Sequence, residues 1–192
     1  MIEVELKVSI DRKDIPKFKD NLEKLGFKLV KRQIEEDLYF NGIDRDFRKT
    51  DEALRVRKTV NLDDDKDISY KITYKGPKLD KISKTREEIE VSVDDYNGAI
   101  EIFKKLGLKP VRPIKKKREL YKNKDITISI DDVTSVGTFV EFEKVVSNKD
   151  ETESARNELL NLMKSLNINT DKSIKKSYLE MRDYNEKLQQ RK

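Results

Sequence analysis

The feature that most constrains the fold is an alternation of apolar and charged residues that recurs along the chain. Residues 2–8 place four aliphatic side chains on one face and Glu3, Glu5 and Lys7 on the other. Successive side chains of a strand point to opposite faces, so this pattern predicts a strand with one apolar and one charged face. A solvated charged face would explain one such strand. Because the pattern recurs in several strands, a solvated face is not a sufficient explanation for all of them.

Composition indicates a folded domain and restricts its chemistry. The chain has 192 residues, enough for one domain with a sizeable core, and its 35% of hydrophobic residues fall in periodic runs although 42% of residues are charged. There is no cysteine and no histidine. These absences exclude disulfides, thiolate chemistry and an imidazole base, and they leave only oxygen ligands for a metal, which favours magnesium, manganese or calcium.

The charge balance and the hydropathy pattern bear on partners and location. The 43 basic and 38 acidic residues give a net charge of +5, compatible with an anionic ligand but too evenly mixed to predict nucleic-acid binding. No apolar run approaches the length of a membrane span, and the first residues do not resemble a signal peptide. We therefore expect no membrane partner and a cytoplasmic location.

Periodicity predicts eight strands and four helices. Two of the helices are expected to end at Gly26 and Gly107, and Asn123-Lys124 is expected to form a hairpin turn. The predicted strands cover residues 2–8, 36–41, 53–60, 68–75, 84–93, 114–122, 126–132 and 138–145, and the predicted helices cover residues 12–25, 95–106, 151–166 and 172–188.

An internal repeat suggests how the strands assemble. A Glu-x-Glu strand, a helix and a Leu-Gly pair occur near the start and again from residue 88. We expect one domain over residues 1–192, with two diverged halves (about 1–83 and 84–145) followed by C-terminal helices over 151–188. The two halves can close into one α+β fold, an eight-stranded antiparallel barrel. Helices packed outside need the apolar faces of the strands, so the charged faces must point inward and give the barrel a polar interior.

The residues predicted to line this interior are of two kinds. Three Glu-x-Glu pairs and one aspartate supply carboxylates: Glu3, Glu5, Glu88, Glu90, Glu141, Glu143 and Asp131. The basic side chains are Lys7, Arg55, Arg57, Lys71, Lys75, Arg86, Lys116 and Arg118. A closed cavity cannot hold so many charges unpaired, so internal salt bridges must neutralise many of them. A ligand that combines hard cations with several phosphates would satisfy both sets.

In order and spacing, these motifs resemble those of the CYTH proteins, or triphosphate tunnel metalloenzymes, over nearly the whole chain. The motifs are Glu3-x-Glu5-x-Lys7, Asp37-x-Tyr39-Phe40, Arg55-x-Arg57, Thr73-Tyr74-Lys75-Gly76-Pro77, Arg86-x-Glu88-x-Glu90, Lys116-x-Arg118, Asp131-x-Val133, Glu141-x-Glu143 and Ser177-Tyr178. The resemblance implies binding of triphosphate with Mg²⁺ or Mn²⁺.

The resemblance also implies roles for the lining residues. Catalysis would rest on Glu3, Glu5, Lys7, Arg55 and Arg57. The triphosphate would be held by Lys7, Arg55, Arg57, Lys75, Arg86, Lys116 and Arg118. The metal would be held mainly by Glu3, Glu5, Glu141 and Glu143, with Asp131, Glu88 and Glu90 as further candidates.

Within the family, residues 116–121 and 137–143 are most similar to class IV adenylyl cyclases, which convert ATP to cyclic AMP and pyrophosphate. Those cyclases carry a His-Phe pair before the first acidic strand, and this chain has no histidine. One alternative is therefore a triphosphatase, in which water attacks the terminal phosphate of inorganic triphosphate or a nucleotide. A non-catalytic module that binds polyphosphate is a further alternative. A homodimer is plausible if apolar outer surface stays uncovered.

Overall fold

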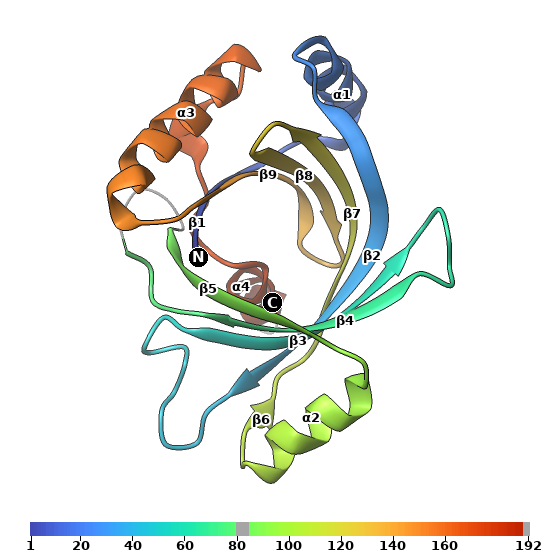
Figure 1. The fold of residues 1–192 in the computed structure, drawn as a ribbon, viewed down its shortest axis with the longest axis vertical. Coiled ribbons are helices and arrows are strands. Elements are labelled where there is room, and N and C mark those ends of the chain that lie inside the picture. Colours follow the sequence, from blue (N-terminus) through green and yellow to red (C-terminus); the bar gives the residue numbers. More distant parts are fainter. Residues whose placement is uncertain (80–84, 190–192) are drawn as a thin grey trace.

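The computed structural model describes residues 1–79 and 85–189, and eight of its strands close into an antiparallel barrel (Figure 1). Neighbouring strands follow the order β3-β4-β5-β1-β9-β8-β7-β2, and β2 pairs with β3 to complete the ring. The strands are β1 (Ile2–Ser9), β2 (Lys28–Asn41), β3 (Ala53–Asn61), β4 (Ile68–Lys75), β5 (Arg86–Val93), β7 (Ile114–Asn123), β8 (Ile126–Val133) and β9 (Gly137–Val146). The predicted barrel is confirmed.

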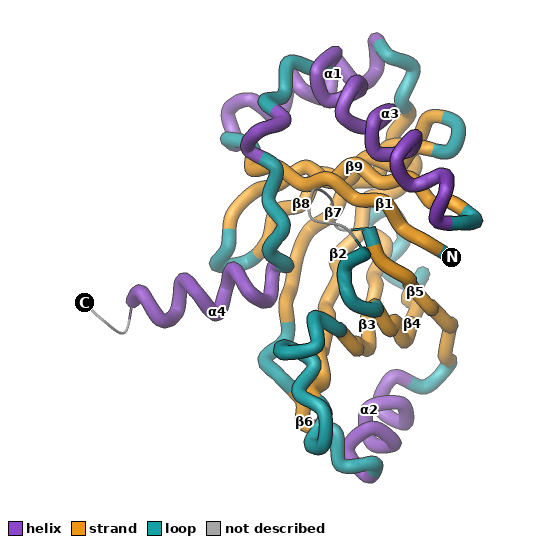
Figure 2. The backbone as a smooth tube through the Cα atoms, turned by 90° about the vertical axis from the view of Figure 1, so that its left-hand side faces the viewer, coloured by secondary structure: helices purple, strands orange, loops and turns teal. Residues whose placement is uncertain are grey.

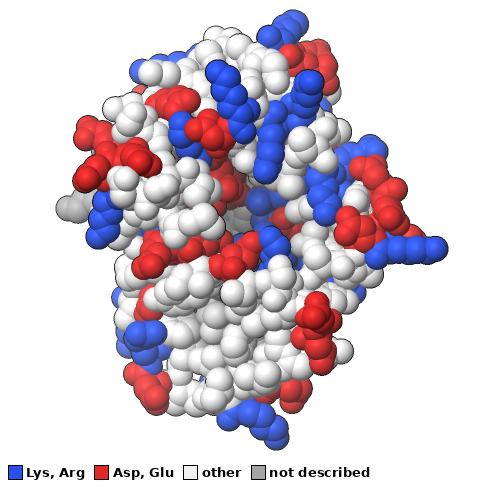
Figure 3. Space-filling model, viewed as in Figure 1, with Lys and Arg blue, Asp and Glu red and all other residues white. Residues whose placement is uncertain are grey.

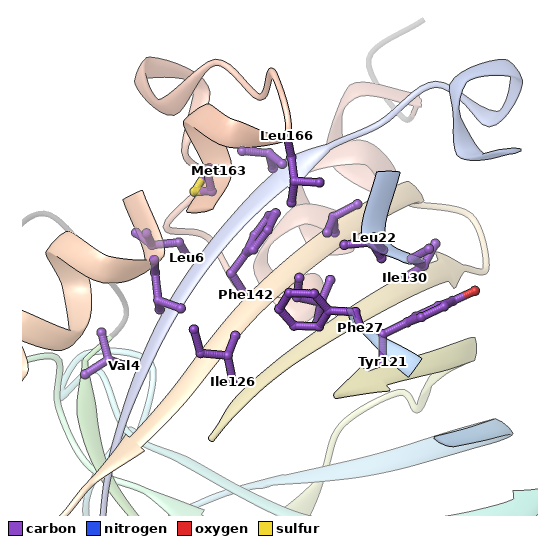
Figure 4. Packing of buried hydrophobic residues seen from close by; sticks show 14 of the residues in the cluster. Val4, Leu6, Leu22, Phe27, Tyr121, Ile126, Ile130, Phe142, Met163 and Leu166 are labelled. Atoms are coloured by element: carbon purple, nitrogen blue, oxygen red, sulfur yellow. The ribbon is translucent and has the colours of Figure 1, made fainter. Parts of the chain in front are cut away.

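The helices lie outside the barrel, as the apolar strand faces require. Helices α1 (Ile15–Lys24) and α3 (Thr152–Ser165) cover β1, β8 and β9, where the largest apolar cluster is buried (Figure 4). Leu6 and Phe142 pack there against Leu22 and Met163, and each of these four side chains is at most 1% exposed. Because this apolar face is the outer one, the charged residues that alternate with it point into the barrel.

The other two helices are α2 (Tyr96–Lys105), which packs over β3 and β4, and α4 (Tyr178–Gln189). Helix α4 extends from the end of the barrel opposite the N-terminus (Figure 2). Three 3₁₀ turns cover Arg12–Asp14, Lys149–Glu151 and Thr170–Lys172. Among the described residues, no helix combines the length and the apolar character needed to cross a lipid bilayer.

Two elements start well away from the predicted residue, and one short strand was not predicted. Strand β2 starts at Lys28 and not at residue 36, because residues 28–35 pair with β7 across an irregularity between Leu29 and Lys31. Helix α4 starts at Tyr178 and not at residue 172. A short strand, β6 (Lys109–Pro110), pairs with the end of β2.

The hairpin turn between β7 and β8 is shifted by one residue, to Lys124-Asp125. Lys124 adopts a positive φ of 51°, whereas the side chain of Asn123 donates a hydrogen bond to the carbonyl of Leu25 at 3.0 Å. The strand predicted from residue 84 begins at Arg86, and residue 84 itself lies outside the described residues.

Candidate active site

The predicted charged residues line the inside of the barrel, and most of them are buried. A hollow at the centre of one face is bordered by acidic and basic side chains (Figure 3). The buried residues are Glu3, Glu5, Lys7, Arg57, Lys116, Arg118, Asp131 and Glu141. Partly buried residues are Arg55, Lys75, Arg86, Glu88 and Glu143. We call this charged interior the tunnel.

The most densely ion-paired part of the tunnel is formed by β2, β3, β7 and β8. Arg57 donates two hydrogen bonds to Asp37, at 2.5 and 2.8 Å. Arg118 contacts Asp131 in the same two-pronged way, at 2.6 and 2.5 Å. Planar guanidinium–carboxylate pairs fix geometry as well as charge. The prediction that internal salt bridges neutralise many of these charges is confirmed here.

Glu35 connects these pairs, although the sequence did not single it out. Its side chain is 2% exposed, and Oε2 lies 2.8 Å from Arg57 and 3.0 Å from Lys116. Asp37 is also buried and was predicted only as part of a strand motif. The Gln33-x-Glu35-x-Asp37 alternation could have revealed both residues, but Glu36 on the outer face obscured it.

A second group, rich in carboxylates, lies on β1, β4, β5 and β9. Lys75 Nζ bridges Glu3 at 2.6 Å and Glu88 at 2.7 Å. Burial, and then the hydrogen bond with Glu3, raises the pKa of Glu88 to about 7. Burial and the nearby Glu3 charge raise the pKa of Glu143 to about 8. This part of the tunnel therefore holds more carboxyl groups than Lys75 can neutralise.

The acidic group fits a divalent cation by the chemistry of its donors. Glu5 and Glu143 are paired across β1 and β9, a position that brings Cβ atoms to about 5 Å. Carboxylate oxygens are the ligands that Mg²⁺ and Mn²⁺ prefer. Among the described residues, no three acidic side chains already converge at the spacing of a metal centre. Glu3, Glu5 and Glu143 are the residues that could hold a metal after side-chain movement.

The end of the tunnel beside α4 is occupied by the segment that leads into that helix. Lys7 Nζ donates a hydrogen bond to the carbonyl of Lys176 at 2.6 Å and lies 3.9 Å from Glu141. Tyr178 is 6% exposed and donates a hydrogen bond to Asp131 at 2.9 Å. The sequence predicted Ser177-Tyr178 as a family motif without a role, and the structure places the tyrosine against the tunnel charges.

Three of the predicted lining residues lie at the edge of the charged interior. Arg86 Nη2 is 3.5 Å from Asp51, which belongs to the loop between β2 and β3. Glu90 is exposed and pairs with Lys71 at 2.5 Å. These contacts put Glu90 and Lys71 apart from the Glu3–Glu88 pair, which Lys75 holds.

Arg55 is held more loosely than Arg57. Its guanidinium lies 3.4 Å from Asp37 and 4.0 Å from Glu88. Its Nε atom is buried and has no hydrogen-bond partner among the described residues. An unsatisfied buried donor is costly in a folded protein, so this guanidinium is suited to an anionic ligand that would accept from it.

The pKa of Asp37 predicts how stability depends on pH. Burial alone would raise it, but Arg57 and Arg55 outweigh burial and lower it to about 2. A depressed carboxyl pKa stabilises the fold above pH 4, and this contribution is lost as the pH falls toward 2. Between pH 5 and pH 2 we expect wild type to lose about 2 kcal/mol more unfolding free energy than Asp37→Asn. Urea titrations would measure this, and equal losses would contradict it.

A closed antiparallel barrel with an ion-paired interior and its helices outside defines a tunnel-type barrel protein rather than a barrel with an apolar core. Comparison with known proteins identifies the family to which this barrel belongs. The model of the CYTH domain matches residues 1–178, so the chain belongs to the CYTH family.

Individual relatives agree with this assignment. A protein of Methanocaldococcus jannaschii, named "Putative adenylate cyclase MJ0240", is 55% identical over 182 residues, 95% of this chain and 99% of that protein. The solved structure of protein PH1819 from Pyrococcus horikoshii is 35% identical, covers 99% of both chains and has a TM-score of 0.83. A solved structure from Hippeastrum, described as a "Putative adenylyl cyclase" that reveals a dominant triphosphatase activity, shares the fold. It is 17% identical, with a TM-score of 0.59 over 87% of this chain and 88% of that chain.

Proposed function

We propose that the chain is a divalent-metal-dependent phosphoryl-transfer enzyme that binds a triphosphate in the tunnel. Its activity would be most like that of a class IV adenylyl cyclase, in which the ribose 3′-hydroxyl of ATP attacks the α-phosphate and pyrophosphate leaves. The 55% identical relative named "Putative adenylate cyclase MJ0240" supports this activity.

The observation that carries the proposal is the buried Arg55 Nε, which has no acceptor among the described residues. It lies in an interior where Arg57 and Arg118 each make a two-pronged contact with an aspartate. A phosphate oxygen would satisfy it, and Arg57 and Lys116 would contribute further positive charge near it. Such preorganised donors stabilise the charge that develops on phosphoryl oxygens.

The acidic group would have a complementary role. Glu3, Glu5 and Glu143 would hold Mg²⁺ or Mn²⁺, which, when bound, supplies charge neutralisation and polarises phosphoryl oxygens. Lys75 would move from its bridge between Glu3 and Glu88 toward the phosphates. The barrel walls would exclude bulk water, which strengthens each of these interactions.

A triphosphatase is the second candidate, in which water attacks the terminal phosphate and orthophosphate leaves. The lining of the tunnel favours it, because the described lining consists largely of charged and small polar groups, such as Thr73 and Ser129, that suit phosphate rather than a purine.

One incubation series tests the proposal. The protein is incubated with ATP or with inorganic triphosphate, each with Mg²⁺, Mn²⁺ or no metal. Cyclic AMP and pyrophosphate would support the cyclase, and ADP or orthophosphate the triphosphatase. Binding without turnover under every condition would contradict an enzyme and favour a polyphosphate-binding module.

The loose contacts of Arg55 give a residue-level prediction. Arg55→Met should weaken binding of inorganic triphosphate by about tenfold or more, since a charge-assisted pair with phosphate is lost. The unfolding free energy should fall less than in Arg57→Met, because the removed contacts to Asp37 and Glu88 are longer than those of Arg57. Calorimetry and urea unfolding would measure the two effects. Arg57→Met is the matched comparison, and it should cost far more stability.

A further inference from the structure

The phenol ring of Tyr178 lies against two of the tunnel cations. Lys7 Nζ is 4.0 Å from the centre of this ring, and Lys116 Nζ is 5.3 Å from it. Both ammonium groups are almost completely buried, with Lys7 at 0% and Lys116 at 3% exposed. An aromatic face within about 6 Å attracts a cation, and the attraction is stronger where water is excluded.

The position of the ring is fixed from several sides. Its hydroxyl donates to Asp131 at 2.9 Å, and its plane packs on Phe139 with ring centres 5.2 Å apart. The segment before it is attached to β1, because the Ile174 N–H donates to the Lys7 carbonyl at 2.7 Å. The next turn of α4 is attached to the barrel by Arg182, whose Nη1 donates to the carbonyls of Arg112 and Pro113.

For Lys7 these contacts differ in kind from the ion pairs elsewhere in the tunnel, whereas Lys116 is also paired with Glu35 at 3.0 Å and lies 3.7 Å from Asp131. The Lys176 carbonyl and the Tyr178 ring are neutral groups that stabilise an ammonium without cancelling its charge. They also restrict where the flexible lysine side chain can place that charge. Restricting the lysine in advance lowers the entropic cost of binding a phosphate.

We propose that Tyr178 is a positioning residue that holds the ammonium groups of Lys7 and Lys116 ready for phosphate at the α4 end of the tunnel. This inference rests on the proposed function. It assigns the closing segment of the chain to substrate binding, as well as to the packing of α4.

Two substitutions distinguish the contribution of the Tyr178 ring from that of its hydroxyl group. Tyr178→Leu removes the aromatic face, and Tyr178→Phe keeps it while losing the hydrogen bond to Asp131. We expect Tyr178→Leu to weaken metal-free binding of inorganic triphosphate by at least about tenfold and to raise KM more than it lowers kcat. Tyr178→Phe should stay within about threefold of wild type.

Met181→Ala is the control, because Met181 packs in the same apolar cluster on α4. It should lower stability without changing triphosphate affinity. Loss of affinity in Met181→Ala equal to that in Tyr178→Leu would show a purely structural role and overturn the inference. An equal loss in Tyr178→Phe and Tyr178→Leu would overturn the assignment to the ring.

A readout that needs no ligand keeps this inference distinct from the proposed function. Lysine acylation followed by mass spectrometry should modify Lys7 and Lys116 slowly in wild type and in Met181→Ala, and faster in Tyr178→Leu. Unchanged labelling in Tyr178→Leu would overturn the inference. Wild-type protein that neither binds nor turns over triphosphate would contradict the proposed function whatever the labelling shows.

Discussion

Glu35→Gln is expected to lower the free energy of unfolding by about 3–5 kcal/mol, the usual cost of removing one partner from a buried ion pair. Glu35 lies 2.8 Å from Arg57 and 3.0 Å from Lys116, and 3.9 Å from Arg118. The amide keeps the shape of the side chain but leaves these cations with one negative charge fewer. Urea unfolding at pH 7 would measure the loss.

A triphosphate anion should return part of this stability. Without a metal, the anion would supply negative charge to the same cations, so its stabilising effect should be larger for Glu35→Gln than for wild type. The control is Glu36→Gln, the next residue on the outer face of β2, which should change stability by no more than about 0.5 kcal/mol. Equal stabilisation of both variants by triphosphate would contradict the tunnel as the binding site.

The barrel could be predicted because its strands alternate strictly. Strand β4 has the predicted bounds, and β3, β8 and β9 differ by only one residue at one or both ends. In these segments the apolar side chains mark the outer face unambiguously. The repeat of two halves stays a prediction, and so do the catalytic, substrate and metal roles of the lining residues.

The start of β2 could not be predicted because its first residues do not alternate. Leu29 and Val30 are adjacent and both exposed, at 45% and 53%. The register shift beside them interrupts the pattern that periodicity relies on. Pairing with β7 places this segment in the sheet, and such long-range pairing cannot be read from local sequence. Glu35 precedes the predicted strand start at residue 36, so it fell outside the predicted strand.

The sequence contains a capping motif that marks the start of α4, and the prediction from periodicity did not use it. Ser177 and Glu180 form a capping box, in which the Ser177 N–H donates to Glu180 at 2.6 Å and the Glu180 N–H donates to the Ser177 hydroxyl at 3.2 Å. This motif places the helix start at Tyr178. The contacts of Tyr178 with Lys7 and Lys116 depend on how the last segment crosses the barrel end, which no local motif encodes.

Glu5→Gln is expected to lower metal-dependent turnover by at least about 100-fold, since a bound cation contributes several kcal/mol of charge stabilisation. Stability should not fall correspondingly. Burial and Glu3 already raise the pKa of Glu143, and Glu5 adds to this repulsion, which an amide would relieve. Initial rates with Mg²⁺ and Mn²⁺, together with thermal unfolding, would measure both effects.

Glu87→Gln provides the control, because Glu87 lies on the opposite face of β5 from Glu88 and is exposed. It should leave turnover and metal dependence unchanged. In Glu5→Gln, affinity for triphosphate without metal should be kept or increased, since one negative charge leaves the tunnel while Arg55, Arg57 and Lys116 remain. Turnover within about threefold of wild type would exclude Glu5 from the metal-binding set, because a lost ligand costs more than that. Loss of metal-free binding would instead show that Glu5 supports the phosphate site itself.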